Sequence, residues 1–72
     1  MSGNTIVNKK ILIIHGYDSK EELLEQIYAI EPDIIILDVI ELPPITKRKI
    51  KEAIHHLKIE TMEVESYIYK PL

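Results

Sequence analysis

Two short runs of aliphatic residues constrain the fold more than any other feature of this 72-residue sequence. Residues 11–14 read Ile-Leu-Ile-Ile and residues 34–37 read Ile-Ile-Ile-Leu. Each run is too short for a helix and rich in β-branched side chains, and each is followed by a polar residue. This is the pattern of a strand that is buried on both faces of a parallel sheet.

The segment between these runs has the features of an amphipathic helix. Ser19 is a suitable N-cap, and Glu22 three residues later completes a capping box. Apolar residues recur at helical spacing through residues 20–30, and Pro32 cannot continue the helical hydrogen bonds. The sequence therefore predicts a helix over residues 20–30.

A second helix and a third strand follow. Residues 39–44 form a turn region with two adjacent prolines. Thr46 is expected to cap the next helix, with Ile45 and Ile50 packed as a hydrophobic staple across its first turn. Residues 61–69 then alternate between apolar and polar side chains, which predicts a half-exposed strand at a sheet edge.

The resulting order is β-α-β-α-β, which predicts an α/β fold with a three-stranded, mainly parallel sheet and right-handed crossovers. We expect a flexible segment over residues 1–9 and one domain over residues 10–72. Strand order 2-1-3 places the helices on opposite faces of the sheet. Order 1-2-3 leaves one face bare, to be covered by a partner chain. Both orders remain open.

Small size favours association with a second chain. A domain of 72 residues has a marginal core, and the absence of cysteine excludes disulfide or zinc-thiolate stabilisation. Either strand order leaves an exposed edge near Val64, Tyr67 and Tyr69. We therefore expect a homodimer with these three residues at or near the interface.

Composition narrows the class of protein further. Hydrophobic residues make up 46% of the chain, which excludes a disordered tail. No apolar run is long enough to span a membrane, and residues 1–10 are too polar for a signal peptide, so we expect a cytoplasmic domain. The net charge of −3 does not identify a partner, and nucleic acid is not expected. Abundant isoleucine, lysine and glutamate with a single arginine fit a thermophile or an AT-rich genome.

Polar residues follow both predicted buried strands. The carboxyl ends of parallel strands are the usual binding edge of an open sheet, and here they carry His15, Asp18 and Asp38. These side chains are candidate metal ligands. The alternative, which we favour, is structural: Asp38 ends its strand and His15 caps a tight turn.

Three cations begin the second predicted helix, at Lys47, Arg48 and Lys49. Cations oppose the helix dipole at this end, and together with unpaired backbone N–H groups they are a candidate site for an anion, a phosphate or a nucleic acid. The alternative, which we favour, is a solvated face that pairs with neighbouring acidic residues such as Glu41. No serine has the setting of a nucleophile elbow and no glycine-rich phosphate loop is present.

One family resemblance reaches specific residues. Residues 31–38, Glu-Pro-Asp-Ile-Ile-Ile-Leu-Asp, resemble the strand of response-regulator receiver domains that ends in the phosphorylated aspartate. Residues 66–72 are similar to the receiver segment with a lysine before a proline, and residues 10–14 match the opening strand. The resemblance implies a flavodoxin-like architecture, Asp38 as phosphoacceptor, Lys70 as its counter-ion and magnesium as a possible cofactor.

The sequence thus supports three main functional hypotheses, and a metal-dependent enzyme built on His15, Asp18 and Asp38 ranks after them. The acidic pair that holds magnesium in receivers is replaced here by His15 and Gly16, so our leading hypothesis is a small, non-catalytic, self-associating binding or protein-interaction module that needs no cofactor. The first alternative is a reduced, receiver-like signalling domain phosphorylated on Asp38. The second is a module that binds anions or nucleic acid through the basic start of the second helix.

Overall fold

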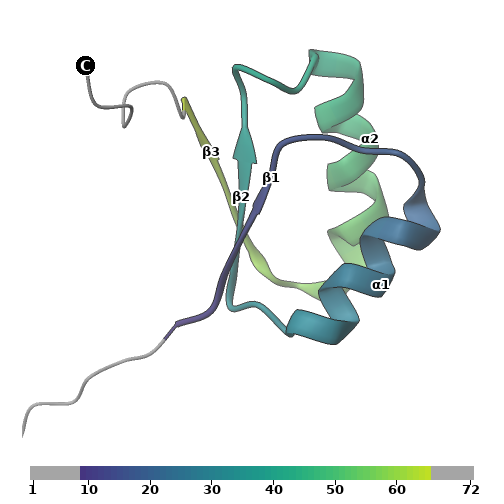
Figure 1. The fold of residues 1–72 in the computed structure, drawn as a ribbon, viewed down its shortest axis with the longest axis vertical. Helices are drawn as coiled ribbons and strands as arrows, with labels where there is room; N and C mark the ends of the chain where they lie inside the picture. Colours follow the sequence, from purple (N-terminus) through teal and green to yellow (C-terminus); the bar gives the residue numbers. More distant parts are fainter. Residues whose placement is uncertain (1–8, 66–72) are drawn as a thin grey trace, which may run out of the picture.

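The computed structural model describes residues 9–65 (Figure 1). The chain alternates strands and helices, as the sequence predicts, and the fold class is confirmed as a small α/β fold with a parallel sheet. The described elements are β1 (Ile11–Ile14), α1 (Lys20–Ile30), β2 (Ile34–Asp38), α2 (Pro44–Ile54), a 3-10 turn η1 (His55–Leu57) and β3 (Glu60–Val64).

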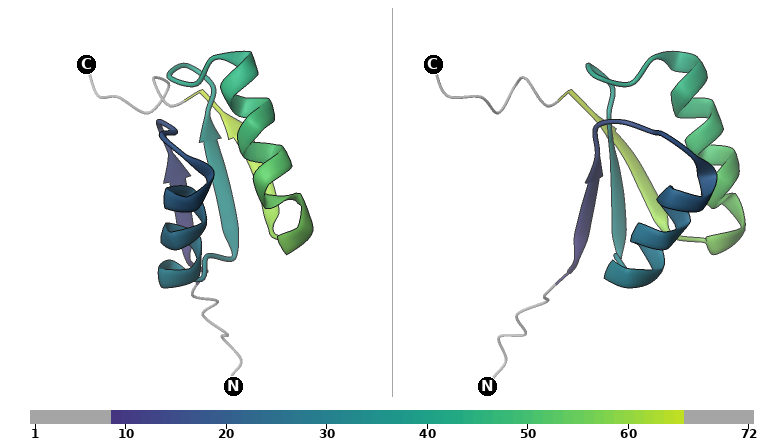
Figure 2. Two further views of the ribbon diagram at one scale, coloured as in Figure 1. Left: turned by 90° about the vertical axis from the view of Figure 1, so that its right-hand side faces the viewer. Right: turned by 45° about the vertical axis from the view of Figure 1, so that its right-hand side comes forward.

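The three strands lie side by side in the order β1-β2-β3, so the structure adopts the second of the two strand orders considered. All pairs are parallel, and one cross-strand row joins Ile13, Ile36 and Met62. Each crossover moves one strand further in the same direction, so two right-handed crossovers place both helices on the same face. Figures 1 and 2 show α1 and α2 together on one side of the sheet.

The expectation that the first two strands are buried on both faces is wrong, most clearly for β1. Its residues alternate, with Ile14 buried under the helices and Ile13 48% exposed on the other side. In β2, Ile35 and Leu37 are fully inaccessible, whereas the intervening Ile36 is only half-buried. The cause is the helical layer, which covers only one face of the sheet.

Helix α1 has the predicted bounds and cap. Ser19 is extended, and its hydroxyl oxygen accepts a hydrogen bond from the Glu22 N–H at 3.1 Å. Glu31 ends the helix in the left-handed conformation, where its N–H donates to the Ile27 carbonyl at 2.7 Å. Pro32 follows directly, and its ring prevents another helical turn.

Helix α2 begins two residues earlier than its expected cap. Pro43 is the N-cap, with φ −62° and ψ 156°, and Pro44 is the first helical residue. Proline suits this position because an N–H group at the first helical residue would have no partner within the helix. The proline ring also favours an extended conformation at the preceding residue. The predicted Thr46 cap is therefore wrong. The staple through Ile45 is wrong as well, because that side chain is 67% exposed.

Strand β3 lies at the edge of the described sheet, as predicted, but its polar side faces the helices. Glu63 is in register with the buried Leu37, whereas Met62 is in register with Ile36 on the opposite face and is 45% exposed. The remainder of the strand predicted over residues 61–69 lies mostly outside the described residues.

The core lies between the helices and the covered face of the sheet. Among residues 9–65 it is a single cluster of nine buried apolar side chains: Ile14, Leu23, Ile27, Ile35, Leu37, Leu42, Ile50, Ala53 and Ile54. A core this small depends strongly on each member.

We predict that Ile35→Ala lowers the free energy of unfolding by about 2–5 kcal/mol, because it removes methyl groups from a site without solvent access. The matched variant Ile45→Ala removes the same atoms from an exposed position and should change stability by less than about 0.5 kcal/mol. Urea denaturation at one fixed protein concentration measures both. Equal effects of the two variants contradict the described core.

Candidate functional site

The face of the sheet opposite the helices carries a continuous set of aliphatic side chains, which we call the open face. Alternation along each strand and the cross-strand register place these residues on one side. Those nearest the edges are about half exposed. The open face consists of Ile11, Ile13, Ile34, Ile36, Met62 and Val64.

A polar pair occupies the carboxyl end of the open face. His15 follows β1 and Asp38 ends β2, and the pairing of Ile14 with Leu37 brings the two strand ends side by side. The Nδ1 atom of His15 lies 2.8 Å from Oδ2 of Asp38. Both residues are among the metal-ligand candidates predicted from the sequence, and the structure brings them into direct contact.

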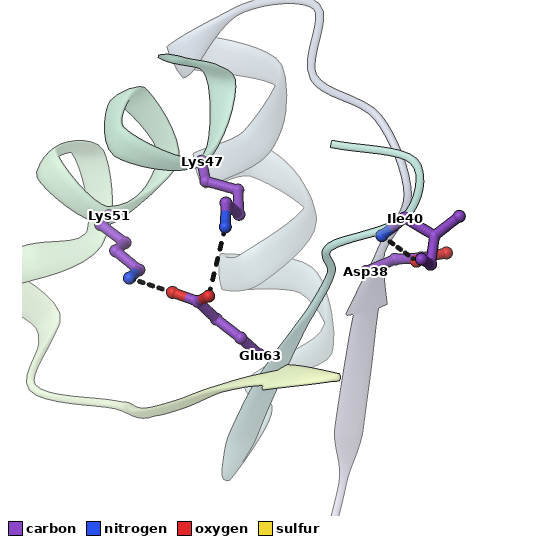
Figure 3. A network of polar contacts seen from close by, with 5 residues as sticks. All are labelled: Asp38, Ile40, Lys47, Lys51 and Glu63. Atoms are coloured by element: carbon purple, nitrogen blue, oxygen red, sulfur yellow. Dashed lines mark hydrogen bonds and ion pairs between the residues drawn. The ribbon is translucent and has the colours of Figure 1, made fainter. Parts of the chain in front are cut away.

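Asp38 is the buried member of this pair, with a side chain only 1% exposed. Its Oδ1 accepts hydrogen bonds from the backbone N–H groups of Ile40, at 3.1 Å, and Glu41, at 3.4 Å. Figure 3 shows the first of these contacts. Hydrogen bonds of this kind are needed to keep a carboxylate away from water. Asp38 therefore ends its strand and fixes the following turn, which agrees with the structural interpretation.

Asp18, the third candidate metal ligand, interacts elsewhere. Interactions with the Asp18 carboxyl group, first by hydrogen bonding and then by charge repulsion, raise the pKa of Glu22. Within residues 9–65, no three His, Cys, Asp or Glu side chains form a group that could hold a metal ion. The three candidate metal ligands therefore do not come together: His15 contacts Asp38, and Asp18 does not join them.

The receiver-like roles are only partly within the described structure. Asp38, the expected phosphoacceptor, has both oxygens engaged by His15 and by the turn after β2. Its expected counter-ion, Lys70, lies outside the described residues, as do the predicted interface residues Tyr67 and Tyr69. Val64 is half-buried at the end of β3, on the open face.

The cations of α2 are arranged differently from the predicted anion site. Because the helix begins at Pro44, the Lys47 N–H is no longer unpaired and donates to the Pro43 carbonyl at 2.9 Å. The Lys47 ammonium group lies 3.3 Å from a carboxylate oxygen of Glu63, and Lys51 contacts the other oxygen (Figure 3). The partner is therefore Glu63 rather than the expected Glu41.

Glu63 and Lys51 form a part of the site that sequence reasoning missed. Hydrogen bonds from Lys51 and then Lys47 lower the pKa of Glu63 below its usual range. Nothing in the sequence indicates that Glu63 contacts Lys47 and Lys51, because the residues are far apart along the chain. The position of α2 over β3 brings them together.

Arg48 and Lys49 are exposed on α2, each beside a depression that Glu52 also lines. The surface that they form is therefore mixed in charge. This agrees with the solvated face favoured by the sequence analysis.

The described residues contain no helix with both the length and the apolar character needed to cross a membrane. Comparison with protein-family models, with curated proteins and with solved structures gives no match for this chain.

We predict that Glu63→Gln lowers the free energy of unfolding at pH 7 by up to about 1 kcal/mol, the usual range for exposed ion pairs. Because the pKa of Glu63 is lowered in the folded chain, the ionised carboxylate stabilises the fold and its removal destabilises it. Its stabilisation is present above the ordinary carboxyl pKa and is lost as the pH falls through the lowered value.

Denaturation curves measured between pH 7 and pH 3 test this, and the wild type and Glu63→Gln should converge at the acid end. Glu60→Gln is the control, because Glu60 lies on the open-face side of the same strand. A difference between wild type and Glu63→Gln that stays constant down to pH 3 contradicts the assigned ion pair.

Proposed function

We propose that this chain is a small α/β interaction module whose binding surface is the open face, and that its partner is a second copy of the chain. The observation that carries the proposal is a sheet face without a covering layer in the described structure, on which Ile11, Ile13 and Met62 are about half exposed. The largest contiguous apolar patch on a protein surface is often a functional one.

Covering the open face contributes substantially to stability. Complete burial of one isoleucine side chain is worth about 1.5–3 kcal/mol, and the edge positions have about half of that still to gain. A core of nine residues is small, so this additional burial is comparable with the stability expected of the whole domain.

A second copy is a suitable partner because the open face is complementary to itself. Its central row, Ile13, Ile36 and Met62, carries no charge, and the ionisable groups lie at the two ends, with Glu60 at one and the His15–Asp38 pair at the other. Two such faces related by a two-fold axis pack their aliphatic rows together, in the manner of two stacked sheets.

The size of the face sets the expected affinity. Three strands about 4.8 Å apart and five residues at about 3.3 Å each give a footprint of about 14 by 17 Å. Even with the relief of the side chains, this is less than the roughly 800 Å² per partner of a standard interface. The proposal therefore predicts a dimer that dissociates on dilution.

We predict that light scattering across a hundredfold dilution series gives a mass that falls from twice 8.4 kDa towards 8.4 kDa. The cause is the small apolar interface, whose dissociation constant should lie within an accessible concentration range. A mass of 8.4 kDa at every concentration removes the second copy as partner.

Variants locate the interface. Ile13→Lys places a charge in the central row and should shift the dissociation to at least tenfold higher concentration, equivalent to 1.4 kcal/mol or more. Ile45→Lys is the matched control, because it makes the same change at an exposed position on α2 and should leave the association unchanged. Equal effects of the two substitutions place the interface elsewhere.

A further inference from the structure

We propose that His15 is a phosphoryl-accepting residue, which takes up the phosphoryl group of a small phosphodonor at its Nε2 atom, and that Asp38 is the positioning residue that prepares it. The inference does not depend on self-association. It rests on the geometry of the His15–Asp38 pair, on the difference in exposure between the two side chains and on their place in the fold.

The first step concerns the proton of the imidazole. Oδ1 of Asp38 accepts hydrogen bonds from the turn after β2, and Oδ2 lies 2.8 Å from Nδ1 of His15. The proposal assigns the donor role to Nδ1 and the acceptor role to the carboxylate, which has no proton to donate when it is ionised. In the neutral ring the proton is on Nδ1, and Nε2 keeps its lone pair.

The second step concerns access. The His15 side chain is 60% exposed whereas that of Asp38 is 1% exposed, so the nucleophilic atom that a solute can reach is on the imidazole. The next residue is Gly16, and apart from the glycine and its two chain neighbours no atom lies within 4 Å of the point where a Cβ at that position would stand. The chain directly after His15 is therefore not crowded by other parts of the fold.

The position in the fold is also suitable. His15 directly follows β1, and Asp38 ends β2, so the pair lies at the carboxyl ends of adjacent parallel strands. Ligands of open parallel sheets bind at this edge. At this edge the carboxylate of Asp38 is buried and the imidazole of His15 is exposed, so His15 is the side chain of the pair that an incoming group meets.

The transfer is a simple displacement. The Nε2 lone pair forms a bond to phosphorus while the P–N bond of phosphoramidate breaks and ammonia leaves. The imidazole ring gains a positive charge and retains its Nδ1 proton, and the adjacent Asp38 carboxylate stabilises that charge. The reaction balances in atoms and electrons without a metal ion, an oxidant or a second substrate.

The test treats the full chain with phosphoramidate and follows the gain of one phosphoryl group by mass spectrometry. His55 and His56 are exposed in η1 and serve as internal comparisons. We expect His15 to react about tenfold faster or more than either of them, in line with the benefit of a positioned group. His15→Gln should abolish the fast phase, and His56→Gln should preserve it.

The product identifies the acceptor atom. A phosphoryl group on imidazole nitrogen is labile in acid and stable in alkali, whereas an acyl phosphate on a carboxylate is labile in alkali. A fast, alkali-stable product on His15 supports the proposal. An alkali-labile product on Asp38, equal rates at the three histidines, or no fast product overturns it.

The substitution Asp38→Asn tests the positioning role of Asp38 because it changes the hydrogen bond to His15 while it keeps an acceptor for the turn. The backbone N–H groups of Ile40 and Glu41 need an acceptor, so the amide oxygen stays with them and the NH₂ group faces His15. Nδ1 must then accept, which moves the ring proton to Nε2 and removes its lone pair.

Nitrogen NMR shifts of the imidazole ring report this change directly. We expect the Nδ1–H form for wild-type His15, the Nε2–H form in Asp38→Asn, and loss of the fast phosphorylation in the variant, with the amide spectrum still that of a folded chain. If Asp38→Asn retains either the Nδ1–H form or the fast reaction, the positioning role of Asp38 is wrong. If the variant does not fold, the ring shifts and labelling rate of wild-type His15 against His55 decide the proposal.

Discussion

The structure depends on one topological constraint, the strand order β1-β2-β3 with parallel pairing. A right-handed crossover places its helix on a fixed side of the sheet, and two crossovers in the same direction place both helices on the same side. The covered face then gathers the nine buried core residues. The opposite face carries isoleucines that are equally suited to burial but have no helix over them. The placement of both helices on one side of the sheet therefore creates the open face.

The local elements were predictable because their signals are local. The bounds of α1 follow from the Ser19 cap, the helical spacing of its apolar residues and Pro32, all within one short segment. The first two strands follow from runs of β-branched residues bounded by polar ones. The alternating order of strands and helices then defines the fold class.

Strand order and helix register were not predictable in the same way. The aliphatic runs are compatible with burial on both faces, and nothing within them tells which face a helix covers or a partner completes. At α2, both Pro43 and Thr46 are plausible N-cap positions, and the cap at Pro43 starts the helix three positions earlier than expected. That shift places Lys47 within reach of Glu63 and away from the unpaired N–H groups of the helix end.

The candidate site shows the same division between local and long-range information. The sequence identified His15 and Asp38 as chemistry-bearing residues, but they are 23 positions apart, and only the register of β1 with β2 makes them a bonded pair. Burial of a carboxylate at this edge requires hydrogen-bond donors, and the turn after β2 supplies two backbone N–H groups. The imidazole of His15 lies within hydrogen-bond distance of the same carboxylate and remains 60% exposed.

The polar pair and the aliphatic rows share one side of the sheet, which couples the two proposed roles physically. Strand alternation puts His15 in line with Ile13 and Asp38 in line with Ile36. A partner that covers the central row therefore has the imidazole at its margin. A phosphoryl group on His15 adds negative charge beside an otherwise uncharged contact, and desolvation of that charge opposes association. The position of the pair at the end of the rows, rather than its chemistry alone, would allow modification to weaken binding.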